Sequence, residues 1–265
     1  MQNNSDILQI NSLSKYFGGL AAVSNCSLKI KRGSITGIIG PNGSGKTTLF
    51  NLIAGNIIPN NGSVIFDNQN ITGVPSHELF SKGILRTFQV AHEFTNLTVL
   101  ENLMMVPGNQ AGENLMKALF KPSLVNKEEQ IIRAKAYEVV EFLNLKHLAN
   151  ENAGNLSGGQ KKLLELGRTM MVDAKLVLLD EVGAGVNRTL LKELGTAIQR
   201  LNKEKGYTFC MIEHDMDFIS RMCDPVIVMS DGGVLFEGTP DEIKTNEKVI
   251  ESYLGRANKS FKENI

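Results

Sequence analysis

A glycine-rich segment, residues 40–48, constrains the possible folds of this chain more than any other part of the sequence. It fits the pattern of a glycine, four further residues, Gly-Lys and a Ser or Thr, which is typical of a phosphate-binding loop. Glycines let the backbone curl until several N–H groups point at one anion. The segment comprises Gly40, Pro41, Asn42, Gly43, Ser44, Gly45, Lys46, Thr47 and Thr48.

The sequence on both sides of this segment supports the same interpretation. Residues 34–39 predict a buried strand, and residues 48–54 predict a helix whose N-terminus faces the loop. Lys46 would add a positive charge for the outer phosphates, and the Thr47 hydroxyl could hold Mg²⁺. The alternative is an ordinary glycine-rich turn before a helix, and the flanking strand and helix make it the weaker one.

Composition excludes several classes of protein. The chain has 265 residues, of which 42% are hydrophobic, so it can build a substantial core. Lys+Arg and Asp+Glu both number 28, and this zero net charge argues against a general attraction to nucleic acid. No apolar run approaches the roughly 18 residues of a membrane-spanning helix. The polar residues 1–6 lack the apolar core of a signal peptide.

The three cysteines, Cys26, Cys210 and Cys223, are an odd number without the spacing of a metal site. Cys26 and Cys210 lie in strand-like apolar surroundings. We interpret all three as reduced core residues of a cytosolic protein. Any role at a membrane would then require a partner protein.

Hydrophobic periodicity predicts an α/β fold with an inserted helical part. Short strand patterns around the loop predict an antiparallel sheet, at residues 7–10, 20–23, 26–30 and 63–66. The pattern of residues 90–155 is mostly helical. Strands and helices then alternate, with apolar strands expected at 176–179, 207–212 and 226–229 and a turn at Gly232-Gly233.

Within the helical part, Thr98 and Glu101 fit a capping box. One helical face is predicted to carry Ile132, Ala136, Val139, Val140 and Leu143. Residues 106–126 contain two prolines and two glycines and are expected to form an irregular insertion. A short amphipathic helix is predicted at residues 115–120, and its role, local packing or contact with a partner, stays open.

Two further segments carry candidate chemistry. Asp180 and Glu181 follow an apolar strand, which places two carboxylates where open α/β sheets bind ligands. Beside a phosphate loop, Asp180 suits the metal shell and Glu181 suits the base that orients water, although the pair could instead cap the next helix. Ser157 is predicted to cap a helix behind two glycines, which gives a second anion-binding helix end or an ordinary capped turn.

In their order and spacing these motifs resemble the ATP-binding subunit of an ABC transporter over nearly the whole chain. The resemblance adds three site residues: Phe17 as the aromatic on adenine, Gln89 as the sensor of Mg²⁺ and water, and His214 as the switch histidine. It implies that Mg²⁺ is held by Thr47, Gln89 and Asp180. It also implies that ATP hydrolysis depends on Lys46, Glu181 and His214.

The resemblance also implies the fold, an α/β P-loop NTPase with an N-terminal antiparallel β subdomain, a RecA-like parallel-sheet core and an inserted helical subdomain. The single ATPase domain would consist of a nucleotide-binding core at 1–89 and 159–235, a helical subdomain at 90–158 and a C-terminal helical extension and tail at 236–265. The signature residues are expected to complete the site of a facing subunit; they are Ser157, Gly158, Gly159 and Gln160. The sequence departs from the common pattern at Val182, where proline is usual, and at Asn187, where aspartate is frequent.

A finer resemblance is to the ATPases of branched-chain amino-acid importers and their relatives for urea and short amides. It rests on residues 17–23, 86–89, 96–102, 213–216 and 249–255. The implied partners are a second ABC ATPase subunit, either a paralogue or a second copy, transmembrane permease subunits and, indirectly, a periplasmic solute-binding protein, with no nucleic acid. The implied location is cytoplasmic, on the inner face of the cell membrane.

Three alternatives accompany this interpretation. The ATPase of a lipid or lipopolysaccharide exporter shares much of the loop and signature sequence, but residues 213–216 and the Leu-Gly ending favour the importer group. A soluble ABC ATPase acting in DNA repair or on ribosomes is disfavoured by the neutral charge. A nucleotide-regulated module without hydrolysis is disfavoured by Glu181, His214 and Gln89.

Overall fold

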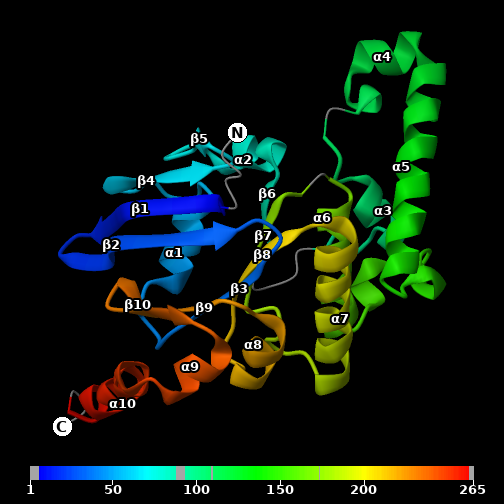
Figure 1. Cartoon of the computed structure of the whole chain (residues 1–265). Coiled ribbons are helices and arrows are strands. Elements are labelled where there is room, and N and C mark those ends of the chain that lie inside the picture. Colours follow the sequence, from blue (N-terminus) through cyan, green and yellow to red (C-terminus); the bar gives the residue numbers. More distant parts are fainter. Residues whose placement is uncertain (1–5, 88–92, 109, 173, 263–265) are drawn as a thin grey trace. The chain divides into compact units, whose positions relative to one another are not determined.

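The structure, a computed structural model of the chain, describes residues 6–87, 93–108, 110–172 and 174–262 (Figure 1). The chain forms two compact units. The first, which we call the core unit, comprises residues 1–86, 175–182 and 199–265. The second, the helical unit, comprises residues 87–174 and 183–198.

A six-stranded sheet in the order β10-β9-β3-β8-β7-β6 forms the centre of the core unit. Its strands are β3 (Ile35–Ile39), β6 (Ile84–Arg86), β7 (Leu176–Asp180), β8 (Thr208–Ile212), β9 (Val226–Ser230) and β10 (Gly233–Gly238). All pairs are parallel except the β9–β10 hairpin. Every residue of β3, β7 and β8 is buried, which confirms the prediction of central strands from continuous apolar runs.

A second sheet, antiparallel and in the order β2-β1-β4-β5, confirms the predicted N-terminal β part. It consists of β1 (Asp6–Phe17), β2 (Leu20–Lys31), β4 (Asn61–Phe66) and β5 (Gln69–Asn70). The three short strands expected before residue 31 are in fact two long ones. Register shifts along β1 and positive φ angles at Ser12 and Asn25 mark bulges. A bulge interrupts the alternation of buried side chains without ending the strand, so the sequence pattern looked shorter than the element.

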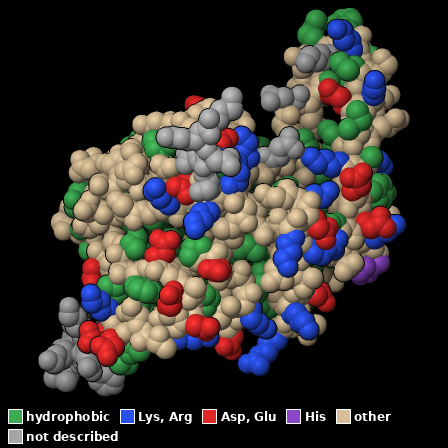
Figure 2. Space-filling view, in the orientation of Figure 1, with side chains coloured by type: hydrophobic (Ala, Val, Ile, Leu, Met, Phe, Trp, Pro, Cys, Tyr) green, Lys and Arg blue, Asp and Glu red, His purple; other side chains and the backbone are tan. Residues whose placement is uncertain are grey.

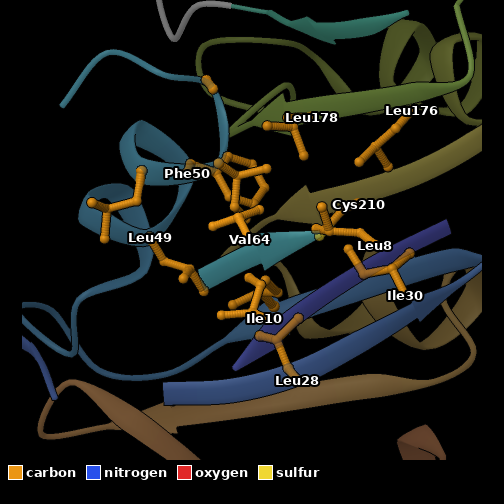
Figure 3. Close-up of a cluster of buried hydrophobic side chains, with 14 of the residues drawn as sticks. Leu8, Ile10, Leu28, Ile30, Leu49, Phe50, Val64, Leu176, Leu178 and Cys210 are labelled. Carbon is orange, nitrogen blue, oxygen red and sulfur yellow. The ribbon is translucent and has the colours of Figure 1, made fainter. Parts of the chain in front are cut away.

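The hydrophobic core of this unit lies between its two sheets (Figure 3). The antiparallel sheet contributes Leu8, Ile10, Leu28, Ile30 and Val64, and the parallel sheet contributes Leu176, Leu178 and Cys210. Helix α1 (Lys46–Ile53) adds Leu49 and Phe50, which are both fully buried. The helix that follows the glycine-rich loop is therefore held by apolar contacts from both sheets.

The predicted turn before the last strand is displaced by one residue. Strand β9 ends at Ser230 and β10 begins at Gly233, so Asp231 and Gly232 form the two-residue turn. Their φ angles are 50° and 81°, as a tight hairpin with a right-handed twist requires. Gly233, expected in the turn, is the first residue of β10.

Among the described residues, five further helices belong wholly or partly to the core unit. They are α2 (Ser76–Lys82), α8 (Met216–Met222), α9 (Pro240–Thr245), α10 (Glu247–Lys262) and the C-terminal part of α7 (Arg188–Lys205). Helix α7 begins in the helical unit. None of the helices in the described ranges is long and apolar enough to cross a membrane.

In the part of the helical unit that the structure describes, there are four further helices and three short 3₁₀ turns. The helices are α3 (Val99–Met104), α4 (Leu115–Phe120), α5 (Pro122–Phe142) and α6 (Gly158–Met170), and the turns are η1 (Ala111–Glu113), η2 (Lys146–Leu148) and η3 (Ala153–Asn155). The predicted capping box is confirmed, because the Thr98 hydroxyl accepts from the Glu101 backbone N–H and the Thr98 N–H donates to the Glu101 carboxylate. The Thr98 N–H and the Thr98 hydroxyl both donate to the Glu101 carboxylate, and these two bonds lower its pKa.

Two predictions in this unit have different outcomes. The predicted apolar face of α5 is confirmed by the burial of Ala136, Val139 and Val140. Pro122 was expected to break structure within the insertion, but it opens α5. Proline fits the first helical turn because its missing N–H has no partner there and its φ angle is already helical.

We expect the three cysteines to react slowly with thiol reagents in the folded protein. All three are free and buried, and burial raises the pKa of Cys26 to about 11 and raises the pKa of Cys210 and Cys223 as well. Since the thiolate is the reactive form, labelling should need unfolding. Titration with a chromogenic disulfide reagent should show all three thiols reacting within minutes only in concentrated guanidinium. Equally fast labelling without denaturant would contradict this packing.

Candidate functional site

The predicted site residues of the core unit gather at one edge of the parallel sheet. Strands β3, β8, β7 and β6 are neighbours in that order. Because they are parallel, their carboxyl ends meet at the same edge, where α/β sheets bind ligands. Gly40 directly follows β3, and His214 is the second residue after the end of β8. Asp180 is the last residue of β7, and Arg86 is the last residue of β6.

The loop between β3 and α1 has a backbone that only glycine can supply at several positions. The φ angles of Gly40, Gly43 and Gly45 are 147°, 74° and 99°. A Cβ atom at Gly40 would collide with the carbonyl oxygen of Met229, and one at Gly45 would collide with that of Ala22. The loop is thus pressed between segments of both sheets, and its shape depends on the absence of side chains.

Backbone hydrogen bonds hold this loop against the β9–β10 turn. The N–H of Gly232 donates to the Ser44 carbonyl at 3.1 Å, and the Gly232 carbonyl accepts from Ser24 N–H at 2.9 Å. Ser24 lies on β2, so the chain of bonds runs from the antiparallel sheet through the turn to the loop. Helix α1 starts at Lys46, and its first-turn N–H groups have no partner within the helix. Such a helix end attracts anions.

Lys46 is buried under the loop, with 6% of its surface exposed. Its Nζ donates to the carbonyl oxygens of Gly40 and Pro41, at 2.8 and 3.1 Å. The buried Ser44 hydroxyl has no hydrogen-bond partner within the described parts of the chain. Asn42 and Gly43 are exposed. A buried ammonium, helix N–H groups at the start of α1 and the Ser44 hydroxyl are a set of donors that fits a phosphate chain.

Asp180 is held by an arginine that the sequence analysis did not single out. Arg86 Nη2 lies 2.6 Å from Asp180 Oδ2, and Arg86 Nη1 donates to Asn51 Oδ1 at 2.5 Å. The two charged side chains are only 11% and 7% exposed. The guanidinium also lies 5.9 Å from the ring centroid of Phe50. The sequence signal was a lone arginine directly after the buried Ile84 and Leu85.

Glu181 and His214 contact each other across neighbouring strand ends. Their Oε1 and Nε2 atoms are 2.9 Å apart. An ionised carboxylate can only accept, so Nε2 carries a proton when Glu181 is charged. The Glu181 backbone has a φ of 50° and donates to the Ile212 carbonyl at 2.9 Å. The side chains are 23% and 50% exposed, which leaves both accessible to water and ligand.

The acidic pair does not cap the following helix, which removes that alternative. Helix α7 begins at Arg188, and the Oδ1 atom of Asn187 accepts from Leu190 N–H at 2.9 Å. Asn187, which stands where aspartate is frequent in the family pattern, thus caps a helix of its own chain. Val182, which stands where the family resemblance leads us to expect proline, is 3% exposed and belongs to the core.

The serine-glycine segment lies in the helical unit and caps α6 as predicted. Gln160 N–H donates to Ser157 Oγ at 3.4 Å, and Ser157 N–H donates to Gln160 Oε1 at 2.9 Å, which completes a capping box. Gly159 has no room for a side chain, because a Cβ atom there would meet Leu190. Gly158 has no atom closer than 3.9 Å to such a position.

Phe17, the predicted stacking partner of adenine, belongs to the antiparallel sheet. Phe17 ends β1 with 50% of its surface exposed, and Lys15 Nζ is 5.4 Å from its ring centroid. The ring is therefore available for stacking. Gln89 lies outside the described residues.

The C-terminal helix contributes a residue that the sequence analysis missed. Tyr253 is 41% exposed, and its phenol lies near the Gly40 backbone; its partial burial raises its pKa, and the polar backbone of Gly40 acts against that rise. Helix α10 thereby contacts the first glycine of the loop. Only the tertiary structure could reveal this contact, because more than 200 residues separate the two positions.

Comparison with known proteins places these features in a family. Residues 23–184 match the family described as ABC transporter, and residues 234–258 match the one described as branched-chain amino acid ATP-binding cassette transporter. The probable branched-chain amino acid transport ATP-binding protein LivG of Archaeoglobus fulgidus is 44% identical, over 94% of this chain and 95% of that protein. The high-affinity branched-chain amino acid transport ATP-binding protein BraF of Pseudomonas aeruginosa is 37% identical, over 95% and 98%.

Solved structures show the same fold. The ADP conformation of MJ1267, an ATP-binding cassette of an ABC transporter, superposes with a TM-score of 0.80 at 38% identity and covers 94% of this chain and 99% of its own. A dimeric post-hydrolysis state of the ATP-binding cassette MJ0796, bound to ADP and Pi, gives 0.71 at 26% identity over 88% and 98%. The glycine loop, the carboxylates at the sheet edge and these matches together show that the chain belongs to the ABC transporter family of ATP-binding proteins.

Proposed function

We propose that this chain is the ATP-hydrolysing subunit of an importer for branched-chain amino acids. The observation that carries the proposal is the gathering of Lys46, Asp180, Glu181 and His214 at one sheet edge of an ABC family member. The match of residues 234–258 to the branched-chain amino acid family, together with the relatives' names, supports the solute class over a lipid exporter or a soluble ATPase.

The loop and α1 would hold the phosphates of ATP. The Lys46 ammonium now bonds to two loop carbonyls, so a triphosphate would exchange those neutral acceptors for charged ones. The first-turn N–H groups of α1 and the Ser44 hydroxyl would add neutral donors. Phe17, exposed at the end of β1, would stack on adenine. Gly43 and Thr48 belong to the same cradle.

Mg²⁺ would be held by the Thr47 hydroxyl and the Asp180 carboxylate, with Gln89 as a further expected ligand. The described residues contain no cluster of three or more His, Cys, Asp and Glu side chains that could hold a metal ion. Mg²⁺ is usually bound by one or two carboxylates, water and substrate phosphates, a set that the Asp180 carboxylate and the phosphates of ATP would supply. When bound, the ion neutralises charge on the phosphate oxygens. Arg86 would hold the Asp180 carboxylate in place.

Glu181 would orient the attacking water and accept its proton. Its contact with His214 fixes the carboxylate at the carboxyl ends of β7 and β8. His214, half exposed, would turn its Nε2–H from Glu181 to the γ-phosphate. Positioning and charge stabilisation of this kind supply most of the catalysis in phosphoryl transfer.

The helical unit would act on a second ATPase subunit. Ser157, Gly158, Gly159 and Gln160 form a capped helix end with room at Gly158, which suits a phosphate held by the facing chain. The dimeric MJ0796 structure supports an assembly of two cassettes. ATP would close the pair because the γ-phosphate contacts both chains, and hydrolysis would favour opening. The facing subunit is a paralogue or a second copy.

The domain division follows from this assembly. We propose that residues 1–89 and 159–235 bind nucleotide, that residues 90–158 form the helical subdomain, and that residues 236–265 form a C-terminal helical extension and tail. The surface around Gln89 and the helical region that follows it would contact the permease. The chain would lie at the inner face of the cell membrane through the permease. A periplasmic solute-binding protein would deliver the amino acid to the same complex.

Replacing the proposed base tests hydrolysis and transport together. Glu181→Gln should retain ATP binding and lower phosphate release roughly 10²- to 10⁴-fold, the usual worth of a general base. In proteoliposomes with the permease, ATP-driven uptake of labelled leucine should fall in parallel. Glu141→Gln, at an exposed side chain of α5, serves as the control. Normal hydrolysis by Glu181→Gln would show that the carboxylate has another role, and uptake of lipid instead of leucine would contradict the solute class.

Removing the buried ammonium tests the phosphate cradle. Lys46→Ala should weaken ATP binding by roughly 10- to 100-fold, because hydrogen bonds to charged groups contribute about 1.5–3 kcal/mol. Titration with a fluorescent ATP analogue measures this change. Lys29→Ala removes an exposed lysine and should leave the affinity unchanged. Equal affinities for both variants would rule out a phosphate contact by Lys46.

Removing the partner of Asp180 should destabilise the fold. Arg86→Met leaves a buried carboxylate without its cation and should lower the free energy of unfolding by about 3 kcal/mol. Urea denaturation measures the loss. Arg32→Met breaks a more exposed ion pair with Asp67 and should cost about 1 kcal/mol or less. If the two variants lose the same stability, Arg86 does not hold Asp180 in solution.

A further inference from the structure

The short helix α4 exposes apolar side chains on most of its surface. Leu115, Met116, Leu119 and Phe120 are 73%, 63%, 64% and 72% exposed. None of the α4 side chains that the structure describes is buried. Scattered exposed apolar residues are ordinary, but contiguous ones mark sites of contact. The amphipathic helix predicted for residues 115–120 therefore exists, and local packing does not account for its apolar side chains.

The base of this segment is anchored by polar groups. Gln110 Nε2 donates to the carbonyl oxygens of Met104 and Pro107, at 3.0 and 2.9 Å. The N–H of Ala111 donates to Glu128 Oε2 on α5 at 2.7 Å. These bonds tie the start of the segment to α3 and α5. The apolar residues of α4 thus follow a segment that hydrogen bonds hold in place.

Lysines are the charged residues within the stretch that carries α4. Residues 114–127 include Lys117, Lys121 and Lys127 and no acidic residue, while Glu113, Glu128 and Glu129 lie directly beside this stretch in the sequence. Lys121 and Lys127 are exposed. Figure 2 shows hydrophobic and basic side chains next to one another at the tip that carries α4 in Figure 1. We call Leu115, Met116, Leu119 and Phe120, with Lys121 and Lys127, the tip surface.

We propose that the tip surface docks on the anionic lipid headgroups of the membrane to which the transporter belongs. Apolar side chains flanked by lysines are what interfacial helices use, since the apolar groups enter the acyl boundary and the cations pair with anionic lipid. Lysine is depleted at the centre of protein–protein interfaces, so a permease loop fits this surface less well. The inference rests on the proposed function, which brings the chain to a membrane.

The contact is weak and reversible. Helix α4 has only six residues, so it can bury little apolar surface in the bilayer. Its affinity for lipid therefore depends on both the apolar side chains and the lysines. Charges at a lipid surface are screened within roughly 10 Å at ordinary salt concentrations. The tip surface would therefore orient the helical unit at the bilayer, while the permease supplies the lasting attachment.

Co-sedimentation of the purified full chain with sucrose-loaded vesicles tests the proposal. Binding is expected to vesicles of phosphatidylcholine with phosphatidylglycerol, not to phosphatidylcholine alone, and should fall at high salt. Leu119→Gln/Phe120→Gln should lower the partition coefficient about tenfold. Ile131→Gln, at a 61% exposed residue of α5 outside the tip surface, should leave it unchanged. Lys121→Glu/Lys127→Glu should abolish the preference for anionic lipid.

Three results would overturn the tip surface as a lipid contact. They are no binding to anionic vesicles, equal binding to neutral vesicles, and wild-type binding by Leu119→Gln/Phe120→Gln. Loss of permease binding in that variant without any vesicle binding would assign the surface to a protein instead. ATP titration of each variant separates this proposal from the function. If the chain binds ATP but not vesicles, only the proposed lipid contact is refuted. If the wild type does not bind ATP, the proposed function is refuted.

Discussion

The contact of the glycine loop with two carbonyl oxygens underlies the rest of the site. Met229 lies on β9 and Ala22 on β2, and their carbonyl groups occupy the space that a side chain at Gly40 or Gly45 would need. Only glycine permits this approach, and the approach joins both sheets to the start of α1. The donors that we propose for phosphate are consequently fixed by the packing of the core, so they would not need to be ordered when nucleotide binds.

The same edge of the sheet concentrates charges that are costly to bury. Lys46 is satisfied by loop carbonyls and Asp180 by Arg86, so neither charge lacks a partner. The partners of Lys46 and of Asp180 differ in how readily a bound ligand can replace them. Carbonyl groups compete poorly with phosphate for an ammonium, whereas a guanidinium is a strong partner for a carboxylate. Lys46 is thus poised to exchange partners, and Asp180 is held in position.

Local patterns predicted much of this structure because their physics is local. The loop, the buried strands and the caps at Thr98 and Ser157 depend on neighbouring residues, and the structure contains them. Features that depend on contacts between distant segments were missed. Bulges hid the true length of β1 and β2, and neither the Arg86–Asp180 pair nor the Tyr253–Gly40 contact leaves a local trace. Pro122 misled because proline both ends and begins helices.

The capping role of Ser157 is compatible with the proposed grip on a facing chain's nucleotide. Its hydroxyl accepts a hydrogen bond from Gln160 N–H, which uses one of its two lone pairs. A hydroxyl also has one proton to donate, and phosphate oxygens only accept. The cap therefore fixes the position of the oxygen and leaves the donor function for a phosphate. Because Gly158 has no side chain at this helix end, an anion could approach closely enough to accept a hydrogen bond from the Ser157 hydroxyl.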